Sequence, residues 1–396
     1  MSLPPLYPLL FKTTEMHMPR KIVIALNSLE RIGKEAKYLG GNSKILVVTD
    51  KSVRSAGAPD KAIDILKADG FEPYLLDSAE PEPRIEVLEA MSSFARKGGF
   101  EIVVGIGGGS VMDTAKLLAV SITNPGNLCD YIGPNLVKKR GIPTICVPTT
   151  AGTGSEVSQF AVFTFDNKKK TCGSPNIIPD MALVDPMLTI SMPPSITAGS
   201  GMDALAHAVE SLISIEATPL TDAFAFLAIK LVFKYLRRAY FRPNDVEARF
   251  NMSLAATVAG IPLCNAKMVI GHSISQTFGP AYRVPHGVSN AMTLPYIMKF
   301  YVLAAGEKLA QIAIESGSNS ECLPTRDAAF IAAKAVKKLA DDINIPASLE
   351  NVGIAQESLP KMAEDILVNF PRPNSPINMN KDNVLKILQW MYKGEI

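Results

Sequence analysis

Hydrophobic and polar positions follow two different patterns in the two halves of the chain. Up to about residue 190, short runs of β-branched and apolar residues alternate with longer stretches of mixed polarity. Short, uninterrupted apolar runs are typical of strands that are buried on both faces of a parallel sheet. The pattern predicts strands at 21–26, 44–49, 71–76, 101–106, 141–148 and 161–165, with 182–186 closing the region, and helices at 28–38, 59–69, 84–97 and 110–120.

From Thr197 onward, apolar residues recur with the spacing of helices, and no strand is predicted. The expected helices are 199–214, 219–240, 244–259, 264–278, 287–304, 306–316, 325–342 and 383–393. The two patterns together predict an α/β domain with a parallel sheet at residues 1–190 and an all-α domain at residues 191–396. Right-handed crossovers would place the carboxyl ends of all the strands, and so the ligand crevice, on one side of the sheet.

Composition narrows the classes of function. The 396 residues are 47% hydrophobic and 20% charged, and the net charge is +2, so nucleic acid is not an expected partner. The five cysteines are scattered without a CxxC pair, which favours a reducing, cytoplasmic location. The apolar start of the chain is broken by prolines and too short to span a bilayer, so we expect no membrane segment.

Histidines are few, and three of the four lie in the second half of the chain. Asp203 and His207 are four residues apart in a predicted helix, so they share one face. With His272 and His286 they would form a set of one carboxylate and three imidazoles able to hold a metal ion. The alternative is that Asp203 and His207 satisfy each other while the other two histidines lie in loops.

Two glycine-rich segments directly follow predicted strands. The first, Gly107-Gly108-Gly109-Ser110, precedes a helix, where backbone N–H groups and the helix dipole favour an anion. Its spacing is not GxGxxG, so a plain flexible turn is the alternative. The second, 149–156, is dense in hydroxyls and glycines and would suit a sugar–phosphate edge, unless it is a surface turn. Side by side in one sheet, the two segments favour a diphosphate site.

Taken together, these motifs resemble the iron-containing, or group III, alcohol dehydrogenase family. The family pattern matches, in order over roughly residues 20–380, the segment 107–110 with Asp113 and Lys116, the segments 149–156, 182–186 and 201–207, and Pro285-His286-Gly287. The resemblance implies a dinucleotide domain and a helical domain with the active site in the cleft between them. It also implies hydride transfer between a small alcohol and its aldehyde or ketone, with NAD(H), a divalent metal (Fe²⁺ first, Zn²⁺ second) and a homodimer or higher homo-oligomer.

The resemblance also implies roles for individual residues. The implied metal ligands are Asp203, His207, His272 and His286. The implied cofactor contacts are Gly107, Gly108, Gly109, Ser110 and Asp113 to the pyrophosphate, Thr149, Thr150 and Thr153 to the nucleotide beyond it, and Lys169, or alternatively Lys170, to the ribose. Asp50 falls where members that prefer NAD carry an aspartate, whose carboxylate would bind ribose hydroxyls and repel a 2′-phosphate.

Two positions depart from the family pattern. Many members carry a further histidine four residues after the position of His272, whereas this chain has Gln276. Glutamine cannot titrate, so a histidine proton relay is not expected here and Gln276 is assigned only to the pocket. Near residue 82, Glu82-Pro83 replaces a frequent Asn-Pro, which leaves a cofactor contact there open.

Rival activities are possible on the same fold. One is a hydroxyacid–oxoacid transhydrogenase, which keeps its nucleotide bound. Another is a dehydroquinate-synthase-like lyase, which would need a basic pocket that the sequence does not reveal. A binding protein without catalysis is disfavoured by the complete ligand set. For the substrate, Arg283 either recognises an acid group or lies at the surface, and a short alkyl chain would suit the apolar residues Phe160, Phe163, Ile261, Leu263 and Phe278.

Overall fold

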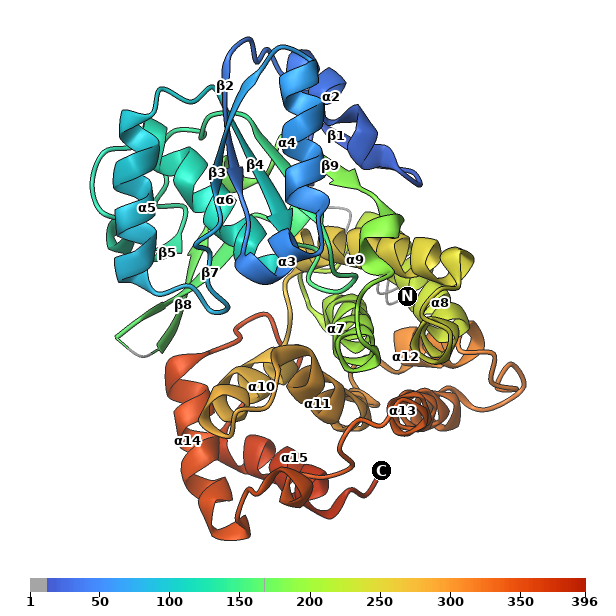
Figure 1. The fold of residues 1–396 in the computed structure, drawn as a ribbon. Coiled ribbons are helices and arrows are strands. Elements are labelled where there is room, and N and C mark those ends of the chain that lie inside the picture. The colour runs from blue at the N-terminus through green and yellow to red at the C-terminus, as the bar shows by residue number, and fades with distance from the viewer. Residues whose placement is uncertain (1–12, 167) are drawn as a thin grey trace.

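The computed structural model describes residues 13–166 and 168–396. It has a sheet half, built from the N-terminal residues, and a helical half that lies below it in Figure 1. The sheet half contains a six-stranded, all-parallel sheet in the order β1-β9-β6-β4-β2-β3. Its strands are β1 (Lys21–Ile24), β2 (Lys44–Val48), β3 (Glu72–Leu76), β4 (Ile102–Gly107), β6 (Thr144–Pro148) and β9 (Met181–Val184). The predicted fold class is confirmed.

Alternating side chains of β2 explain why helices cover both faces of this sheet. Ile45 and Val47 pack in one cluster with α2 (Ile32–Tyr38) and α4 (Ala58–Ala68). Leu46 and Val48 point to the opposite face, where they pack with α5 (Ile85–Lys97) and α6 (Gly109–Thr123). Since successive strand residues face opposite ways, an unbroken apolar run can supply two cores. The two helix layers can be followed on either side of the strands in Figure 1.

The strand order creates a switch point between β2 and β4. After β2 the chain moves to β3 at one edge, whereas after β4 it moves through β6 to β9 in the other direction. Ligands of open α/β sheets bind at the carboxyl ends of strands where the order reverses in this way. The segments that follow β2 and β4 are those that contain Asp50 and Gly107–Ser110. The topology thus places these predicted cofactor residues beside each other.

A small second sheet has the order β5-β8-β7 and lies beside α6. It consists of β5 (Gly133–Pro134), β7 (Phe160–Phe165) and β8 (Lys168–Gly173), of which β7 and β8 form an antiparallel pair. The sequence predicted β7 followed only by a turn. The β8 segment was missed because its three lysines hide the alternation of a strand. The short α3 (Lys51–Ser55) was also missed, and the predicted helix 28–38 begins as a 3-10 turn at Ser28–Arg31.

The helical half packs around α7 (Pro194–Ile213), which is buried along almost its whole length. The other helices of this half are α8 (Pro219–Phe241), α9 (Val246–Ala266), α10 (Ile270–Ala281), α11 (His286–Tyr301), α12 (Gly306–Glu315), α13 (Thr325–Asp342), α14 (Leu359–Asn369) and α15 (Lys381–Lys393). The last strand, β9, ends before residue 190 and α7 begins after it. The division into domains at that residue itself stays a prediction.

Two helix boundaries in this half were predicted wrongly. The predicted helices 244–259 and 264–278 leave a break around Pro262, a residue type that disrupts helix interiors. In the structure α9 runs through Pro262 to Ala266, and the break falls at Lys267, whose φ is 62°. Just before Pro262, α9 packs closely on the sheet half, since Gly260 lies so near Gly154 that a Cβ on either glycine would overlap with the other's backbone. Helix α14 was not predicted at all.

No single helix among residues 13–166 and 168–396 is both long and apolar enough to cross a membrane. The helices α9 and α10 meet that test only as a pair, and they are bent by 110° at their junction.

Candidate active site

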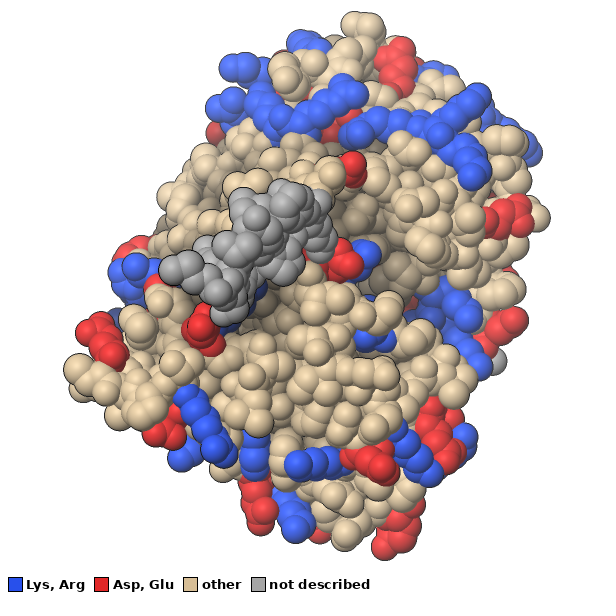
Figure 2. Space-filling model, turned by 180° about the vertical axis from the view of Figure 1, so that it is seen from behind, with Lys and Arg blue, Asp and Glu red and all other residues tan. Residues whose placement is uncertain are grey.

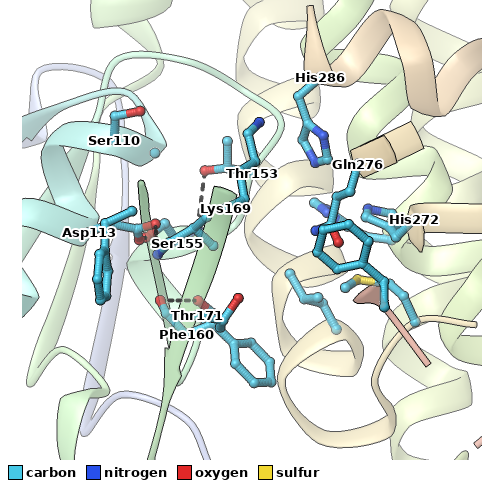
Figure 3. Close-up of a pocket in the computed structure, with 18 of the residues that line it drawn as sticks. Ser110, Asp113, Thr153, Ser155, Phe160, Lys169, Thr171, His272, Gln276 and His286 are labelled. Atoms are coloured by element: carbon cyan, nitrogen blue, oxygen red, sulfur yellow. Dashed lines mark hydrogen bonds between the residues drawn. The ribbon is translucent and has the colours of Figure 1, made fainter. Parts of the chain in front are cut away.

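One continuous cleft, with a volume of about 690 Å³, runs between the sheet half and the helical half. Figure 3 shows its two sides. We call one side the helical wall, formed by Asp203, His207, His272, Gln276 and His286. The other side is the sheet wall, formed by Gly109 and Ser110 at the start of α6, by Thr153 and Ser155, and by strands β7 and β8. Four predicted cofactor residues of the two glycine-rich segments do not line the cleft: Gly107, Gly108, Thr149 and Thr150. The predicted site residues that line it are distributed over two facing surfaces.

Asp203 and His207 lie on one face of α7, as their spacing predicts. Their side chains are 4% and 6% exposed, and Asp203 Oδ1 is 3.7 Å from His207 Nε2. The helix carries Met, Ala and Leu around them and no proline after its first turn, so its geometry is regular where the pair is held. The short i,i+4 distance results from that regularity.

His272 and His286 reach the same carboxylate from two other helices. Asp203 Oδ1 is 3.9 Å from Nε2 of His272, on α10, and 3.8 Å from Nε2 of His286, at the start of α11. Gly287 permits the second approach, because a Cβ at this position would overlap with the backbone of Gly199 on α7. The three helices thus converge although their residues are far apart in sequence.

These four donor groups fit a divalent metal ion. Around a tetrahedral ion with ligand distances of about 2.1 Å, donor atoms are about 3.4 Å apart, close to the 3.7–3.9 Å separations from Asp203 Oδ1 to the three imidazoles. Donor atoms of Asp203, His207 and His272 all lie within 4.8 Å of one another. A set of three imidazoles and one carboxylate suits Fe²⁺ or Zn²⁺. The convergence favours the metal-site hypothesis over a self-satisfied Asp–His pair.

Protonation states in the cluster are those that metal ligands need. Burial lowers the pKa of His272 to about 4, and it acts in the same direction on the pKa values of His207 and His286. Burial alone would raise the pKa of Asp203, but the neighbouring histidines and a hydrogen bond from Asn290 outweigh it and lower that pKa. Neutral imidazoles and an ionised carboxylate offer lone pairs to a cation without first losing a proton.

Two buried side chains that the sequence analysis missed orient this cluster. Glu210 Oε1 lies 2.6 Å from His272 Nδ1, which directs Nε2 of that ring toward Asp203. Asn290 Nδ2 donates to Asp203 Oδ1 at 2.6 Å and lies 3.1 Å from His272 Nε2 and 3.2 Å from His286 Nε2. Helical spacing could have revealed both, because Glu210 is three residues after His207 and Asn290 four after His286.

The sheet wall presents the backbone of a glycine-rich turn as well as side chains. Gly108 caps α6 and Gly109 begins it, and Gly109 and Ser110 line the cleft. A Cβ at Gly109 would lie 2.9 Å from Thr153 Cγ2, so any larger residue there would displace the Thr153 side chain. The amide of Thr149 donates to Gly107 O at 3.0 Å. This bond holds the two predicted nucleotide segments together at the start of a 15-residue helix, where the dipole favours an anion.

Asp50 stands at the carboxyl end of β2, as predicted, but it does not line the cleft. Its Oδ1 accepts a hydrogen bond from the Val53 amide at 2.9 Å and caps α3. The neighbouring Thr49 hydroxyl donates to Ile106 O at 2.8 Å, which ties this strand end to β4. Asp50 is thus fixed at the switch point, and one of its two carboxylate oxygens is used within the protein.

Asp113 is engaged with other protein groups. Its Oδ1 accepts from the Ser155 hydroxyl at 2.5 Å and lies 3.0 Å from Lys116 Nζ, and its Oδ2 accepts from the Val162 amide at 2.9 Å. These bonds connect α6 with the loop 149–155 and with β7. The predicted contact between Asp113 and pyrophosphate stays a prediction, and the structure adds a bracing role.

Strand alternation separates the two lysine candidates. Lys169 lines the cleft, and its Nζ pairs with Glu82 Oε1 at 2.7 Å, whereas Lys170 does not line the cleft. The charge of Lys169 is also among the causes that lower the pKa of His286. Glu82 and Pro83, which replace the Asn-Pro frequent in the family, both line the cleft with Lys169. The replacement thus supplies the carboxylate that pairs with this lysine.

The apolar predictions were partly wrong. Phe160, Phe163 and Leu263 line the cleft. Ile261 and Phe278 lie instead in hydrophobic cores, where they are 2% and 0% exposed. Apolar character alone cannot distinguish a cleft residue from a core residue.

The charged residues settle one alternative and correct one expectation. Of the two roles left open for Arg283, the structure favours the surface, because Arg283 is exposed and does not line the cleft. No basic pocket was expected from the sequence, yet Lys169, Lys267 and Arg372 all line the cleft. Lys267 and Arg372 gave no sequence signal, because they are more than a hundred residues apart and belong to no motif.

Comparisons with known proteins agree with this geometry. Residues 19–186 match the family model described as iron-containing alcohol dehydrogenase, and residues 197–392 match that of the Fe-containing alcohol dehydrogenase family, C-terminal. The chain is 35% identical over 377 residues to long-chain-alcohol dehydrogenase 1 of Geobacillus thermodenitrificans, covering 94% of this chain and 95% of the relative.

Solved structures are similar over nearly the whole chain. A crystal structure of 1,3-propanediol oxidoreductase matches with a TM-score of 0.93 at 34% identity, covering 96% of this chain and 100% of the other. A sulfoacetaldehyde reductase from Bifidobacterium kashiwanohense, solved in complex with NAD⁺, matches with a TM-score of 0.86 at 29% identity, covering 96% and 99%.

Proposed function

Because the chain belongs to the iron-containing alcohol dehydrogenase family, we propose that it is a metal-dependent, NAD(H)-dependent oxidoreductase that interconverts a small alcohol and its aldehyde or ketone. Its relatives are named for a long-chain alcohol, a propanediol and sulfoacetaldehyde. Their names share alcohol–aldehyde chemistry but no single substrate, so the family supports the reaction class and leaves the substrate open.

One observation carries this proposal: the four-donor cluster and the glycine-rich start of α6 open into the same cleft. A divalent ion held by Asp203, His207, His272 and His286 would supply a Lewis acid that polarises an alcohol or carbonyl oxygen. NAD(H) on the sheet wall would supply the hydride acceptor or donor. The two walls of one cleft can then bring a reacting carbon and a nicotinamide together, which is the protein's main contribution to hydride transfer.

The chain's own residues hold and orient these groups. The amide groups at the start of α6 would attract the negative diphosphate of the cofactor, and Lys169, which lines the cleft, would contact its ribose. Glu210 keeps the His272 ring in place through Nδ1. Gln276 lines the cleft beside His272, but its amide cannot carry a proton near pH 7. We therefore assign Gln276 to the shape and hydrogen bonding of the pocket and assign no side chain as catalytic base.

The choice of metal follows from ligand chemistry. We propose Fe²⁺ as the working ion, from the family, with Zn²⁺ as the alternative. Zn²⁺ binds such sites more tightly than Fe²⁺ by the Irving–Williams order. Protein purified without added iron is therefore expected to carry zinc wherever the two ions compete equally.

We also propose that the protein acts in the cytoplasm as a homodimer or higher homo-oligomer, without nucleic-acid or membrane partners. All five cysteines are free thiols in the structure, and three of them are buried, which suits a reducing compartment. Light scattering of the purified protein would test the assembly, and a monomeric mass would contradict it.

An assay of NADH oxidation with a panel of short aldehydes and ketones tests the proposed function. Turnover is expected with an aldehyde alone, to be abolished by a chelator and restored by Fe²⁺ or Zn²⁺. A transhydrogenase would instead need an oxoacid as second substrate, and a lyase would consume no NADH. Absence of turnover with every carbonyl compound in the metal-loaded protein would contradict the proposal.

A further inference from the structure

The end of the cleft beside His272 carries positive charge that the proposed reaction does not use. Lys267 lies at the break between α9 and α10, and Arg372 lies in the segment that follows α14. Both line the same cleft as the four donor groups. Seen from behind, the molecule is hollowed between its two halves, and Lys and Arg side chains lie at the edges of this hollow (Figure 2).

Arg372 is held at the cleft but keeps donors free. Its Nε donates to the Ser273 hydroxyl at 2.9 Å, and that hydroxyl donates to Phe370 O at 2.8 Å. Ser273 directly follows the ligand histidine on α10, so the guanidinium is tied to the helix that carries His272. Within the described residues, Nη1 and Nη2 of Arg372 donate to no protein acceptor. Glu210 is near enough to feel this charge, yet its hydrogen bonds come from the backbone and ring of His272.

Lys267 adds a second cation under an unusual backbone constraint. Its φ of 62° and ψ of 163° lie in a region that essentially only glycine occupies without strain. A lysine kept at such a position in a cleft indicates a use for its side chain. No carboxylate of the described residues lies within ion-pair distance of Lys267 Nζ. The cleft cation of the sheet wall differs, since Lys169 pairs with Glu82.

We propose that Lys267 and Arg372 bind an anionic group at the end of the substrate opposite its carbonyl carbon. The proposal rests on the proposed function and gives its substrate a class: a short aldehyde that bears a carboxylate, sulfonate or phosphonate. The planar guanidinium suits two oxygens of such an anion, and the ammonium adds a point charge. The apolar side chains of Leu263, Met268 and Phe370 line the same cleft and would cover a short alkyl spacer.

Substitution of Lys267 tests this class of substrate. The measured quantity is the ratio of kcat/KM for an anionic aldehyde to kcat/KM for a neutral one of equal length, with 4-oxobutanoate against butanal. Sulfoacetaldehyde and phosphonoacetaldehyde, each against propanal, distinguish the three kinds of anion. For the preferred anion, Lys267→Met should lower the ratio about tenfold or more, as expected when a charge-assisted hydrogen bond is lost. Lys334→Met, which removes an exposed lysine of α13 outside the cleft, is the matched control and should not change the ratio.

A second variant keeps the test independent of folding. Lys267→Gly removes the same charge and relieves the backbone strain, so it should be at least as resistant to thermal unfolding as the parent while its ratio falls equally. The inference is overturned if the parent prefers the neutral aldehydes, or if the ratio is the same in Lys267→Met and Lys334→Met. The proposed function fails separately, since in that case neither kind of aldehyde would support NADH oxidation in any variant.

Discussion

The two walls of the cleft are built by different means. The helical wall presents side-chain atoms, one carboxylate and three imidazoles held by α7, α10 and α11. The sheet wall presents the backbone of a glycine-rich turn where β4 meets α6, together with side chains such as Ser110, Thr153 and Lys169. The metal site depends on the donor atoms that its side chains provide. The glycine-rich turn depends on the lack of side chains, which lets a ligand approach the backbone. Substitutions on the two walls should therefore separate metal binding from cofactor binding.

The largest expected effect is loss of a ligand from the helical wall. His272→Ala should remove most of the bound metal and bring alcohol oxidation down to background, because one of four donor groups is missing. The folded protein should still bind NADH, since the sheet wall is untouched. Elemental analysis and NADH fluorescence titration measure the two properties, and a full metal complement in the variant would disprove the assignment of His272.

A smaller effect is expected from Glu210, which acts through His272. Glu210→Gln keeps the shape but weakens the hydrogen bond to Nδ1, and such changes in supporting residues typically cost about 10–100-fold in metal affinity. Competition with a metal indicator measures this affinity. If the affinity stays at the parent value, the 2.6 Å contact between Glu210 and His272 does not tune the site.

Glu210 also gives a pH test on the metal-free protein. The pKa of His272 is lowered to about 4 by burial. The unfolded chain therefore binds a proton at this residue below about pH 6.5, whereas the folded protein does not. This difference should lower the unfolding free energy by about 2 kcal/mol between pH 7 and pH 5. The pKa of Glu210 is raised to about 8, also by burial. Its folded form therefore gains stability as pH falls through the same window. Glu210→Gln removes this opposing gain, so its unfolding free energy in urea should fall more steeply from pH 7 to pH 5 than that of the parent.

Asp50, at the end of β2 outside the cleft lining, tests whether a side chain contributes to the choice between NADH and NADPH. Asp50→Gly should relax the preference for NADH over NADPH, on the order of tenfold, because it removes repulsion of a 2′-phosphate. Its side chain also caps α3, so Asp50→Asn, which keeps a cap but loses the charge, is the control for stability. If the parent uses NADPH at low concentration as well as NADH, side-chain recognition at Asp50 is wrong.

The smallest effect is expected at Gln276, on the helical wall but outside the donor set. Gln276→Ala should leave metal content largely intact and change turnover or substrate range by a few-fold. Gln276→His should add an inflection near pH 6–7 to the rate profile, because it introduces a titrating group. Loss of metal in Gln276→Ala comparable to that in His272→Ala would make Gln276 a ligand and end the four-residue assignment.

The difference between the walls also explains what the sequence could predict. Asp203 and His207 were identified by helical spacing, and Gly107–Ser110 by their place between a strand and a helix. The fold class followed from apolar runs such as that of β2, whose alternate residues serve two cores. In each case the information lies within one segment of the chain.

What the sequence could not predict depends on distant segments meeting. Lys267 and Arg372 are unremarkable until the structure places them in one cleft. Ile261 and Phe278 are apolar, as pocket residues often are, but their side chains are buried in hydrophobic cores. Helix α9 continues through Pro262, where it packs on the sheet half close to Gly154. Local preference is overruled by tertiary packing at such places.

The close approach of Gly287 to Gly199 limits what a motif search can establish. A related chain could carry the aspartate and all three histidines with their usual spacing, yet have alanine at the position of Gly287. The extra methyl group would push α11 away from α7 and move His286 out of reach of Asp203. Such a chain would carry the four ligand residues without forming the site, so annotation by ligand residues alone would count it as an enzyme. Checking that Gly287 is present would be a simple filter.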